Sequence, residues 1–430
     1  MPNVKTLQRS FAGGEISPEM YGRIDDVKYQ AGLKTCRNFI VKPTGPAANR
    51  PGTQFVREVK NSANVTRLIP FTFSTTQTVV IELGAGYFRF HTNGATILSG
   101  GSPYEIANSY AAADLMDIHY VQSADVMTLV HPNYPPAELR RLGATNWTLT
   151  NISFGALIAP PATVTGSATG VTTYKYFNQY VVTAIASDGI SESVASNLAT
   201  GPLVNVTAVT KANPGVITTS ANHNLVVGAK VYISGISGMT QLNGNYYLVN
   251  TVPSNTTLTL KTLSGIAVDT TSYTTYVSGG TITPQSICGN LYETGVSNTI
   301  SWASVAGASR YNVYKFSGGS YGYIGSTTDL LLIDDNIAPD LSLTPPTYET
   351  VFNSSGNYPG AVSYYEQRRC FAGTTNAPQN IWMTKSGTES DMSYSLPITD
   401  DDRISIKVAA REANTIRHIV PLSSLILLTS

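Results

Sequence analysis

The chain has 430 residues, a formal net charge of zero and only 13% charged residues, so it can bury cores in about two to four domains. Its three cysteines, Cys36, Cys288 and Cys370, are far apart, which argues against a disulfide framework or a cysteine metal site and indicates assembly in a reducing cytoplasm. No stretch reaches about 18 consecutive apolar residues and no apolar signal region opens the chain, so we expect neither a membrane span nor a signal peptide. Abundant Gly, Ser, Thr and Asn, with 25 Tyr, are typical of all-β folds with many turns.

The N-terminal arm, residues 1–55, differs in composition from everything that follows. A glycine pair at 13–14 is followed by Ser-Pro-Glu at 17–19, which predicts a helix start with a serine cap. The charges over 25–34 predict a short solvated helix, and the Pro and Gly residues over 43–52 end it. With so little apolar periodicity, the arm is predicted to stay extended and to lie on another surface, of its own domain or of a neighbouring subunit.

The arm also carries a motif. The run FAGGEISP at 11–18 is followed in order by Arg23, Tyr29, Gly32, Cys36-Arg37-Asn38, Pro43, Gly45 and Arg50-Pro51-Gly52. Over about 45 residues this resembles the opening of bacteriophage tail nozzle (tail tube) proteins and related neck proteins of short-tailed phages. The resemblance implies that the arm helps to build a six-fold ring of subunits beneath the portal. The candidate inter-subunit residues are Phe11, Gly13, Gly14, Glu15, Pro18, Arg23, Tyr29, Arg37, Asn38, Arg50 and Pro51.

Charge is distributed unevenly along the chain. Residues 1–70 contain eleven Lys and Arg against five Asp and Glu, whereas residues 151–300 contain four of each sign. The basic surplus could face nucleic acid. The alternative, a solvated arm that pairs with an acidic neighbour, is favoured because the basic residues are interspersed and no aromatic platform runs beside them.

Residues 56–158 are predicted to form blades of a β-propeller. Apolar residues alternate over 79–83 and at Phe88 and Phe90, and Asn93-Gly94 predicts a hairpin turn. A second unit ends in a strand with Trp147, and each unit has about 40 residues, the size of a four-stranded blade. His119, Asp125 and His131 lack a third ligand at workable spacing, so we expect strand-end polar groups rather than a metal site.

Residues 159–203 and 285–345 are predicted to be two parts of one sandwich. Tyr180, Val182 and Ala184 alternate as in the last strands of a fibronectin type III or immunoglobulin-like sandwich, which the segment resembles. The opening strands come only downstream, around Ile300 and Trp302, so the strand order is permuted and Trp302 is the predicted core aromatic. Two separate incomplete sandwiches are the alternative.

The insert at 204–284 is predicted to be a small β-barrel. Its pattern of His223, Leu225, Gly228, Val231, Ile233-Ser234-Gly235 and Leu242-Asn243-Gly244 resembles the FCCH domain, named for a half-domain of ubiquitin-activating enzymes. The insert has no cysteine and no adenylating domain accompanies it, so we expect decoration or contact on the outside of a particle. His223 is interpreted as a turn or cap residue. The Gly-Ile-Ser-Gly run at 235–238 lacks the strand-to-helix context of a nucleophile elbow.

Residues 346–430 are predicted to form further blades. We expect one strand over 361–371, a turn over 373–378 and a strand over 381–383. Asp400, Asp401 and Asp402 are interpreted as caps of backbone amides with Arg403 as their neutralising partner, since no calcium-loop spacing follows. The apolar end at 422–430 predicts an unpaired strand edge, so either another segment completes the sheet or the given chain stops short of the full product.

Together these patterns predict an all-β protein: propeller-like blades at 56–155 and 358–430 that contact each other, interrupted by a permuted sandwich that carries an FCCH-like barrel. The resemblance implies a structural virion protein of a phage tail, a homo-oligomeric ring, hexameric in that family, around a channel for double-stranded DNA that serves genome retention and ejection. Its partners would be portal or adaptor proteins and tail fibre or spike proteins, after assembly in the bacterial host cytoplasm. No catalytic residue, cofactor or metal is predicted. The alternatives are a receptor- or glycan-binding adhesin and a glycan hydrolase, which would need paired carboxylates.

Overall fold

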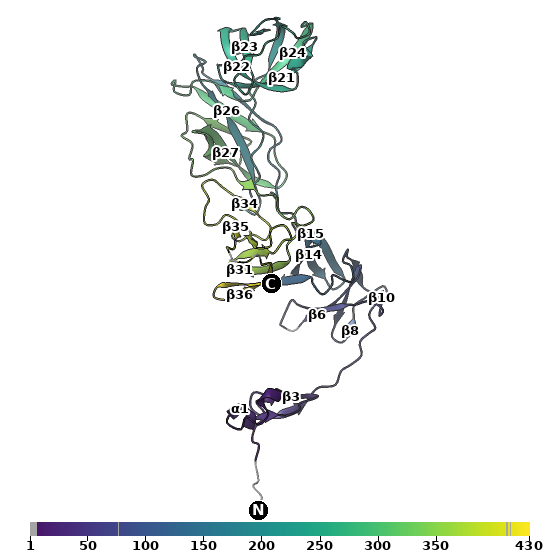
Figure 1. The fold of residues 1–430 in the computed structure, drawn as a ribbon. Helices are drawn as coiled ribbons and strands as arrows, with labels where there is room; N and C mark the ends of the chain where they lie inside the picture. Colours follow the sequence, from purple (N-terminus) through teal and green to yellow (C-terminus); the bar gives the residue numbers. More distant parts are fainter. Residues whose placement is uncertain (1–6, 76, 410–411, 413) are drawn as a thin grey trace, which may run out of the picture.

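A computed structural model describes residues 7–75, 77–409, 412 and 414–430. Almost all of its regular structure is β-strand, which confirms the all-β class. Figure 1 shows an elongated arrangement with the N-terminal arm at one end, the blades in the middle, then the sandwich, and the barrel at the opposite end. No helix among these residues is long and apolar enough to cross a membrane.

The first two blades share one core. The first sheet has the order β11-β7-β6-β5, with β8 on β7, and the second is the meander β12-β13-β14-β15. Asn93 and Gly94 take φ of 51° and 72° between β7 and β8, so the predicted Asn-Gly hairpin is present. The stacked rings of Phe90 and Trp147, 4.3 Å between centroids, join the two sheets. The strands are β5 (Arg67–Thr72), β6 (Thr78–Gly84), β7 (Tyr87–Thr92), β8 (Ala95–Thr96), β11 (Glu105–Ala107), β12 (His119–Ser123), β13 (Val126–His131), β14 (Tyr134–Gly143) and β15 (Asn146–Asn151), with β9 (Leu98–Ser99) and β10 (Ser102–Pro103) as a small hairpin.

A third blade, from the C-terminal part of the chain, packs against the second. Its order is β31-β32-β33-β35, and β31 lies beside β12. Phe154 and Phe371 pack edge to face in a cluster that also holds Val130, Val362 and Trp382, so the segments on either side of the lobe contact each other as expected. The strands are β31 (Ala361–Tyr365), β32 (Arg368–Ala372), β33 (Asn380–Met383) and β35 (Ile404–Lys407), followed by the hairpin β36 (Ile416–Pro421) and β37 (Leu425–Thr429); β30 (Thr347–Tyr348) pairs with β34 (Ser393–Tyr394).

The predicted single strand over 361–371 is wrong. Glu366 and Gln367 take φ of 45° and 61° and turn the chain back, so β31 and β32 are two strands of a hairpin. A two-residue turn with both φ positive normally uses Asn or Gly. Because neither is present here, the sequence gives no sign of this turn.

The sandwich has two three-stranded sheets. One has the order β16-β26-β29 and the other β18-β27-β28, from β16 (Val164–Thr169), β18 (Tyr180–Ala186), β26 (Ser297–Trp302), β27 (Ala308–Ser317), β28 (Ser320–Thr327) and β29 (Leu331–Asp334). Trp302 and Val182 lie in the same buried cluster, so the alternative of two incomplete sandwiches is wrong. We predicted that the opening strands of the sandwich come only after the insert. This is wrong for β16, which precedes β18 in the chain and pairs with β26.

The insert is a closed six-stranded barrel. Its order is β19-β20-β23-β22-β21-β24, and Val231, Ile233 and Leu258 are among the residues that fill it. The elements are β19 (Val204–Val209), β20 (Val216–Thr219), β21 (Lys230–Ser237), η2 (Thr240–Leu242), β22 (Asn245–Ser254), β23 (Thr257–Lys261) and β24 (Ser278–Pro284). The short pair β17 (Phe177–Asn178) and β25 (Ile287–Cys288) lies at its junction with the sandwich.

Candidate inter-subunit interface

The arm is a small module rather than an extended chain. β1 (Gly14–Glu15) pairs with β2 (Gly32–Leu33), and β3 (Phe39–Val41) forms a hairpin with β4 (Ala47–Asn49). The predicted helix over 25–34 is shortened to α1 (Val27–Gln30), whose first turn is capped by Asp26. The predicted serine cap is wrong, because Ser17 makes no side-chain cap bond to the 3-10 turn η1 (Pro18–Met20).

Backbone hydrogen bonds hold this module together. The Phe11 amide donates to the Gly45 carbonyl at 2.7 Å, and the Gly13 amide to the Ala31 carbonyl at 3.0 Å. A Cβ added at Gly13 would lie 2.9 Å from the Lys28 carbonyl oxygen, so only glycine fits there. The Glu15 carboxylate accepts from the Cys36 amide at 2.8 Å.

The eleven candidate contact residues therefore fall into two groups. Some shape the module from within: Phe11, Gly13 and Glu15 through the bonds above, Gly14 and Asn38 through φ of 63° and 60°, and Tyr29 in α1. The others lie exposed on its surface: Pro18, Arg23, Arg37, Arg50 and Pro51. Glu15 and Asn38 of the first group are exposed as well, so residues of both groups are open to contact with a neighbouring subunit.

Exposed apolar side chains are the feature of the arm that sequence reasoning missed. Within residues 7–55 no apolar side chain is buried, and Val27 and Phe39 are 83% and 51% exposed. They do not repeat with a helix or strand period, so periodicity could not reveal them. The large exposed ones are Leu7, Tyr21, Ile24, Val27, Phe39, Ile40 and Phe55.

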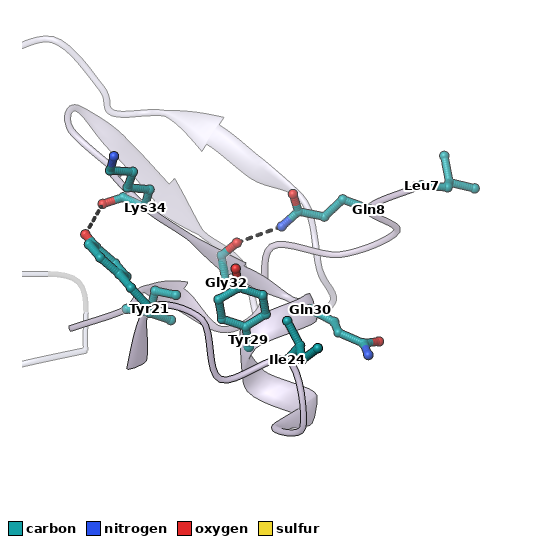
Figure 2. Close-up of a pocket in the computed structure, with 9 residues that line it drawn as sticks. Leu7, Gln8, Tyr21, Ile24, Tyr29, Gln30, Gly32 and Lys34 are labelled. Atoms are coloured by element: carbon teal, nitrogen blue, oxygen red, sulfur yellow. Dashed lines mark hydrogen bonds between the residues drawn. The ribbon is translucent and has the colours of Figure 1, made fainter. Parts of the chain in front are cut away.

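An open hollow of about 970 Å³ concentrates part of this surface. Figure 2 shows Leu7, Tyr21, Ile24 and Tyr29 around it, with Gln8 bonded to the Gly32 carbonyl. The lining is mixed, since Gln30 and Lys34 also contribute. A hollow lined by both apolar and polar side chains is suited to receive a side chain of another protein subunit.

The arm stands clear of its own blades. Residues 51–58 are exposed and form no helix or strand, and Figure 1 shows the arm's elements separated from the blades by this linker. The described part of the same chain therefore leaves the arm's apolar surface uncovered.

The basic surplus of the arm is smaller than the sequence suggested. Residues 7–55 contain seven Lys and Arg against four Asp and Glu. Lys60 and Arg67, counted in the earlier surplus, belong to the first blade, where Lys60 pairs with Glu105 and Arg67 donates to the Leu115 and Ile118 carbonyls. With Lys5, which lies outside the described residues, the arm at 1–55 has a surplus of four. Of its basic residues, Arg23 is paired with Asp25 at 2.8 Å.

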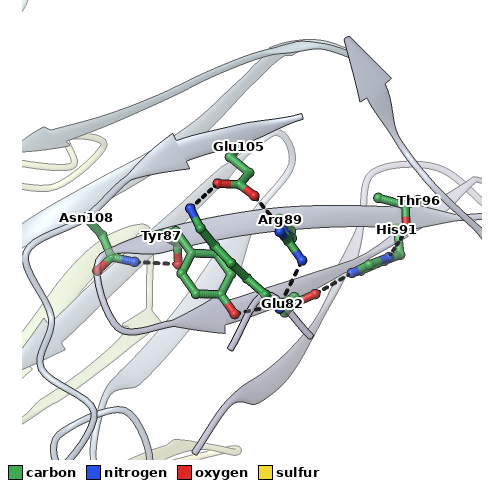
Figure 3. A network of polar contacts seen from close by, with 8 residues as sticks. Glu82, Tyr87, Arg89, His91, Thr96, Glu105 and Asn108 are labelled. Carbon is green, nitrogen blue, oxygen red and sulfur yellow. Dashed lines mark hydrogen bonds and ion pairs between the residues drawn. The ribbon is translucent and has the colours of Figure 1, made fainter. Parts of the chain in front are cut away.

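A buried polar network fixes the point where the linker joins the first blade (Figure 3). Glu82 is 1% exposed, and its oxygens accept from the Tyr87 hydroxyl at 2.7 Å and the Lys60 amide at 3.1 Å and lie 3.0 Å from His91 Nε2. Burial, together with Glu82, raises the pKa of Tyr87. Both Glu82 oxygens already have partners, so the network is an anchor for the start of the blade rather than an open acid-base site.

The histidines and acids of the blades do not converge on a metal. His119 stacks on His418 with ring centroids 4.6 Å apart, Asp125 pairs with Arg141, and His131 Nδ1 accepts from the Asn133 amide. In the described ranges no three His, Cys, Asp or Glu side chains are grouped as metal ligands.

Three predictions concern single polar residues outside the arm: those for Asp402 and His223 are confirmed, and the one for Arg403 is wrong. Asp402 accepts from the Ser395 and Thr399 amides, as expected of a turn cap. His223 Nδ1 accepts from the Leu225 amide at 3.0 Å, as expected of a turn residue. Arg403 does not neutralise the aspartates: its guanidinium reaches Glu349 at 2.8 Å and lies over the Tyr394 ring.

Comparison with known proteins identifies only the barrel. A search of curated proteins found none that matches the chain. Residues 212–285 match the family model of the ubiquitin-activating enzyme E1 FCCH domain, a match that covers β20 to β24 of the closed barrel but not β19. The barrel insert is thus similar to an FCCH domain, and this likeness concerns one module of the chain.

Proposed function

We propose that the chain is a structural subunit of a phage tail nozzle or neck that assembles through its arm into a closed ring around a DNA channel. The observation that carries this proposal is the arm itself, a module with no buried apolar side chain that its own blades leave uncovered. Such a surface is stabilised when another subunit covers it. The resemblance of residues 11–52 to the opening of nozzle proteins indicates which assembly that is.

A ring also gives the arm's modest charge a role. Each arm adds a surplus of four positive charges, and closed symmetry repeats them once per subunit. The resulting collar suits an acidic portal-side partner or passing DNA phosphates, and salt weakens either contact. Because the basic residues are scattered rather than clustered, DNA would slide past without being held.

The proposed place of the protein is the phage particle. Portal or adaptor proteins would contact the ring on one side and tail fibres or spikes on the other. The role is mechanical rather than enzymatic, with genome retention and ejection as its outcome. Six subunits are the order implied by the resemblance.

Deleting residues 1–55 tests the proposal. The full chain should form rings in negative-stain images and one large species by light scattering, whereas the truncated chain should be monomeric with an unchanged β-type circular dichroism spectrum. A variant that replaces only residues 56–58 with Gly and Ser is a matched control, since it changes the exposed linker but keeps the whole arm, and it should still assemble. Rings of unchanged size from the truncated chain would overturn the proposal.

A further inference from the structure

A cleft lies where the sandwich meets the barrel. Figure 1 shows this junction of the two modules in its upper part. Its volume is about 150 Å³, which accommodates one sugar ring. Four segments form it: 168–174 of the sandwich, 222–225 of the barrel, and the two crossings between the modules at 201–204 and 284–288. The cleft is thus a product of the insertion, because neither module contains it alone.

An exposed aromatic ring stands at this cleft. Tyr174, 41% exposed, lines it, and Tyr176, two residues further along the same segment, is 48% exposed and meets Tyr292 edge to face with centroids 5.7 Å apart. A Cβ at Gly228 would lie 3.5 Å from the Phe177 ring, so this ring lies against the barrel's turn. Aromatic rings left exposed at a concave site are typical of a binding surface, because a tyrosine offers an apolar face and a polar tip.

The cleft carries no fixed charge. None of its lining residues is Asp, Glu, Lys or Arg, and burial lowers the pKa of His223, which keeps its imidazole neutral. Nearby Glu293 is occupied by hydrogen bonds from Thr172, Thr173 and Asn290. A charged ligand would lose water here without gaining a counter-charge, so the site favours a neutral one.

Polar groups for such a ligand are present. Asn222 and Asn224 are exposed on either side of buried His223. Ser286 is fully buried in the cleft wall, and its hydroxyl has no partner of normal hydrogen-bond geometry in the described part of the chain, with only the Cys288 thiol as a weak neighbour. A buried hydroxyl left without a partner costs stability, which a ligand hydroxyl in the cleft would recover.

We propose that this cleft binds a neutral glycan, with one ring in the cleft between the asparagine amides and Ser286 and the neighbouring unit on the face of Tyr174. A pyranose presents C–H groups on its faces and hydroxyls around its edge, which matches an aromatic rim and a neutral polar wall. This goes beyond ring assembly and does not depend on it, since the arm lies at the opposite end of the molecule.

The test uses the full chain and soluble probes. Neutral gluco-, galacto- and manno-oligosaccharides are titrated by calorimetry, with sialylated and sulfated oligosaccharides and an uncharged tyrosine-free peptide as comparison probes. Soluble oligosaccharides avoid the avidity that a ring would show on a cell or array surface. We expect at least one neutral oligosaccharide to bind and the charged ones and the peptide not to bind.

Three substitutions locate the site. Tyr174→Ala should weaken binding about tenfold, as expected for one lost aromatic contact. Tyr246→Ala is the matched control, because Tyr246 is a tyrosine of similar exposure, 46% against 41%, that lies elsewhere on the barrel, against Tyr232. Ser286→Ala should weaken binding while leaving the unfolding midpoint of the free protein unchanged or higher.

Several outcomes would overturn the proposal. These are binding of no neutral oligosaccharide at millimolar concentration, equal loss in the Tyr246→Ala control, or preference for the peptide or a charged oligosaccharide. If the cleft variants still form rings of subunits in negative-stain images, ring assembly does not depend on glycan binding.

Discussion

The N-terminal arm and the paired blades distribute their charged and apolar side chains between interior and surface in opposite ways. In the blades, Arg369 is wholly buried and bridges Glu138 of the second blade and Glu389 of its own. Within residues 7–55 of the arm, no charged side chain is buried, and seven large apolar side chains are exposed. The blades are therefore stabilised by contacts buried within them. The arm has a defined backbone structure, but its apolar side chains become buried only when another surface covers them. Substitutions at buried positions should change folding, and substitutions in the arm should change assembly.

Arg369→Ala should produce the largest loss of stability. It leaves the buried Glu138 carboxylate without its main partner, and breaking a buried pair on one side costs about 3–5 kcal/mol. Urea unfolding followed by circular dichroism measures it. Arg140→Ala is a matched control, because Arg140 pairs with the same carboxylate from a side chain that is 46% exposed, and should cost less than about 1 kcal/mol. Equal losses in the two variants would contradict the comparison.

The same pair predicts how blade stability depends on pH. Burial opposes ionisation of Glu138, but hydrogen bonds and charge from Arg369, then from Arg140, hold its pKa below the ordinary value of 4.5. A carboxyl whose folded pKa is lowered contributes stability that is present above its unfolded pKa and lost as pH falls through the folded one. Blade stability should therefore fall below about pH 4.5. In Arg369→Ala only burial and the weaker Arg140 pair remain, so the fall should shrink or reverse; an unchanged fall would contradict this cause.

Trp302→Ala should cost somewhat less, about 3 kcal/mol, at the lower end for a buried tryptophan. Trp302 packs on Tyr311 in the sandwich core, but its indole N–H has no hydrogen-bond partner in the described residues, so part of the loss is offset when the ring is removed. Phe316→Ala on β27 is the control, since this ring is 41% exposed. The unfolding transition of the sandwich, followed by tyrosine fluorescence, distinguishes the two.

The blades and the arm also differ in how much of their structure could be predicted from the sequence. Period-two alternation and the Asn93-Gly94 pair predicted the blade strands and a hairpin, because buried faces and special turns leave a local pattern. The Glu366-Gln367 turn, the partner of Arg403 and strand β16 left none, since each is decided by tertiary contacts. The arm's motif was readable, but the glycines within it serve its internal turns, and its exposed apolar residues follow no period.

Glu82→Gln should lower the free energy of unfolding by an intermediate amount, about 1–3 kcal/mol, because it removes charge from a buried hydrogen-bond acceptor. The loss should come with faster amide exchange around Lys60, whose backbone N–H donates to Glu82. Glu105→Gln is the control, since the Glu105 side chain is 25% exposed and should cost less. Unchanged exchange at Lys60 in Glu82→Gln would show that the network does not anchor the linker.

Substitutions in the arm should have the smallest effect on folding but should abolish assembly. Phe39 and Ile40 lie exposed on β3, where a serine leaves no cavity, so Phe39→Ser with Ile40→Ser should change the free energy of unfolding by less than about 0.5 kcal/mol. The same pair should abolish the ring, because apolar area that a neighbour would cover is lost at the subunit contact. Leu263→Ser makes the same kind of change at an exposed apolar residue of the barrel and should leave rings intact. If the arm variant unfolds earlier as a monomer, the module has an apolar core of its own. If it still forms rings as the barrel control does, the exposed apolar face of the arm is not the subunit contact.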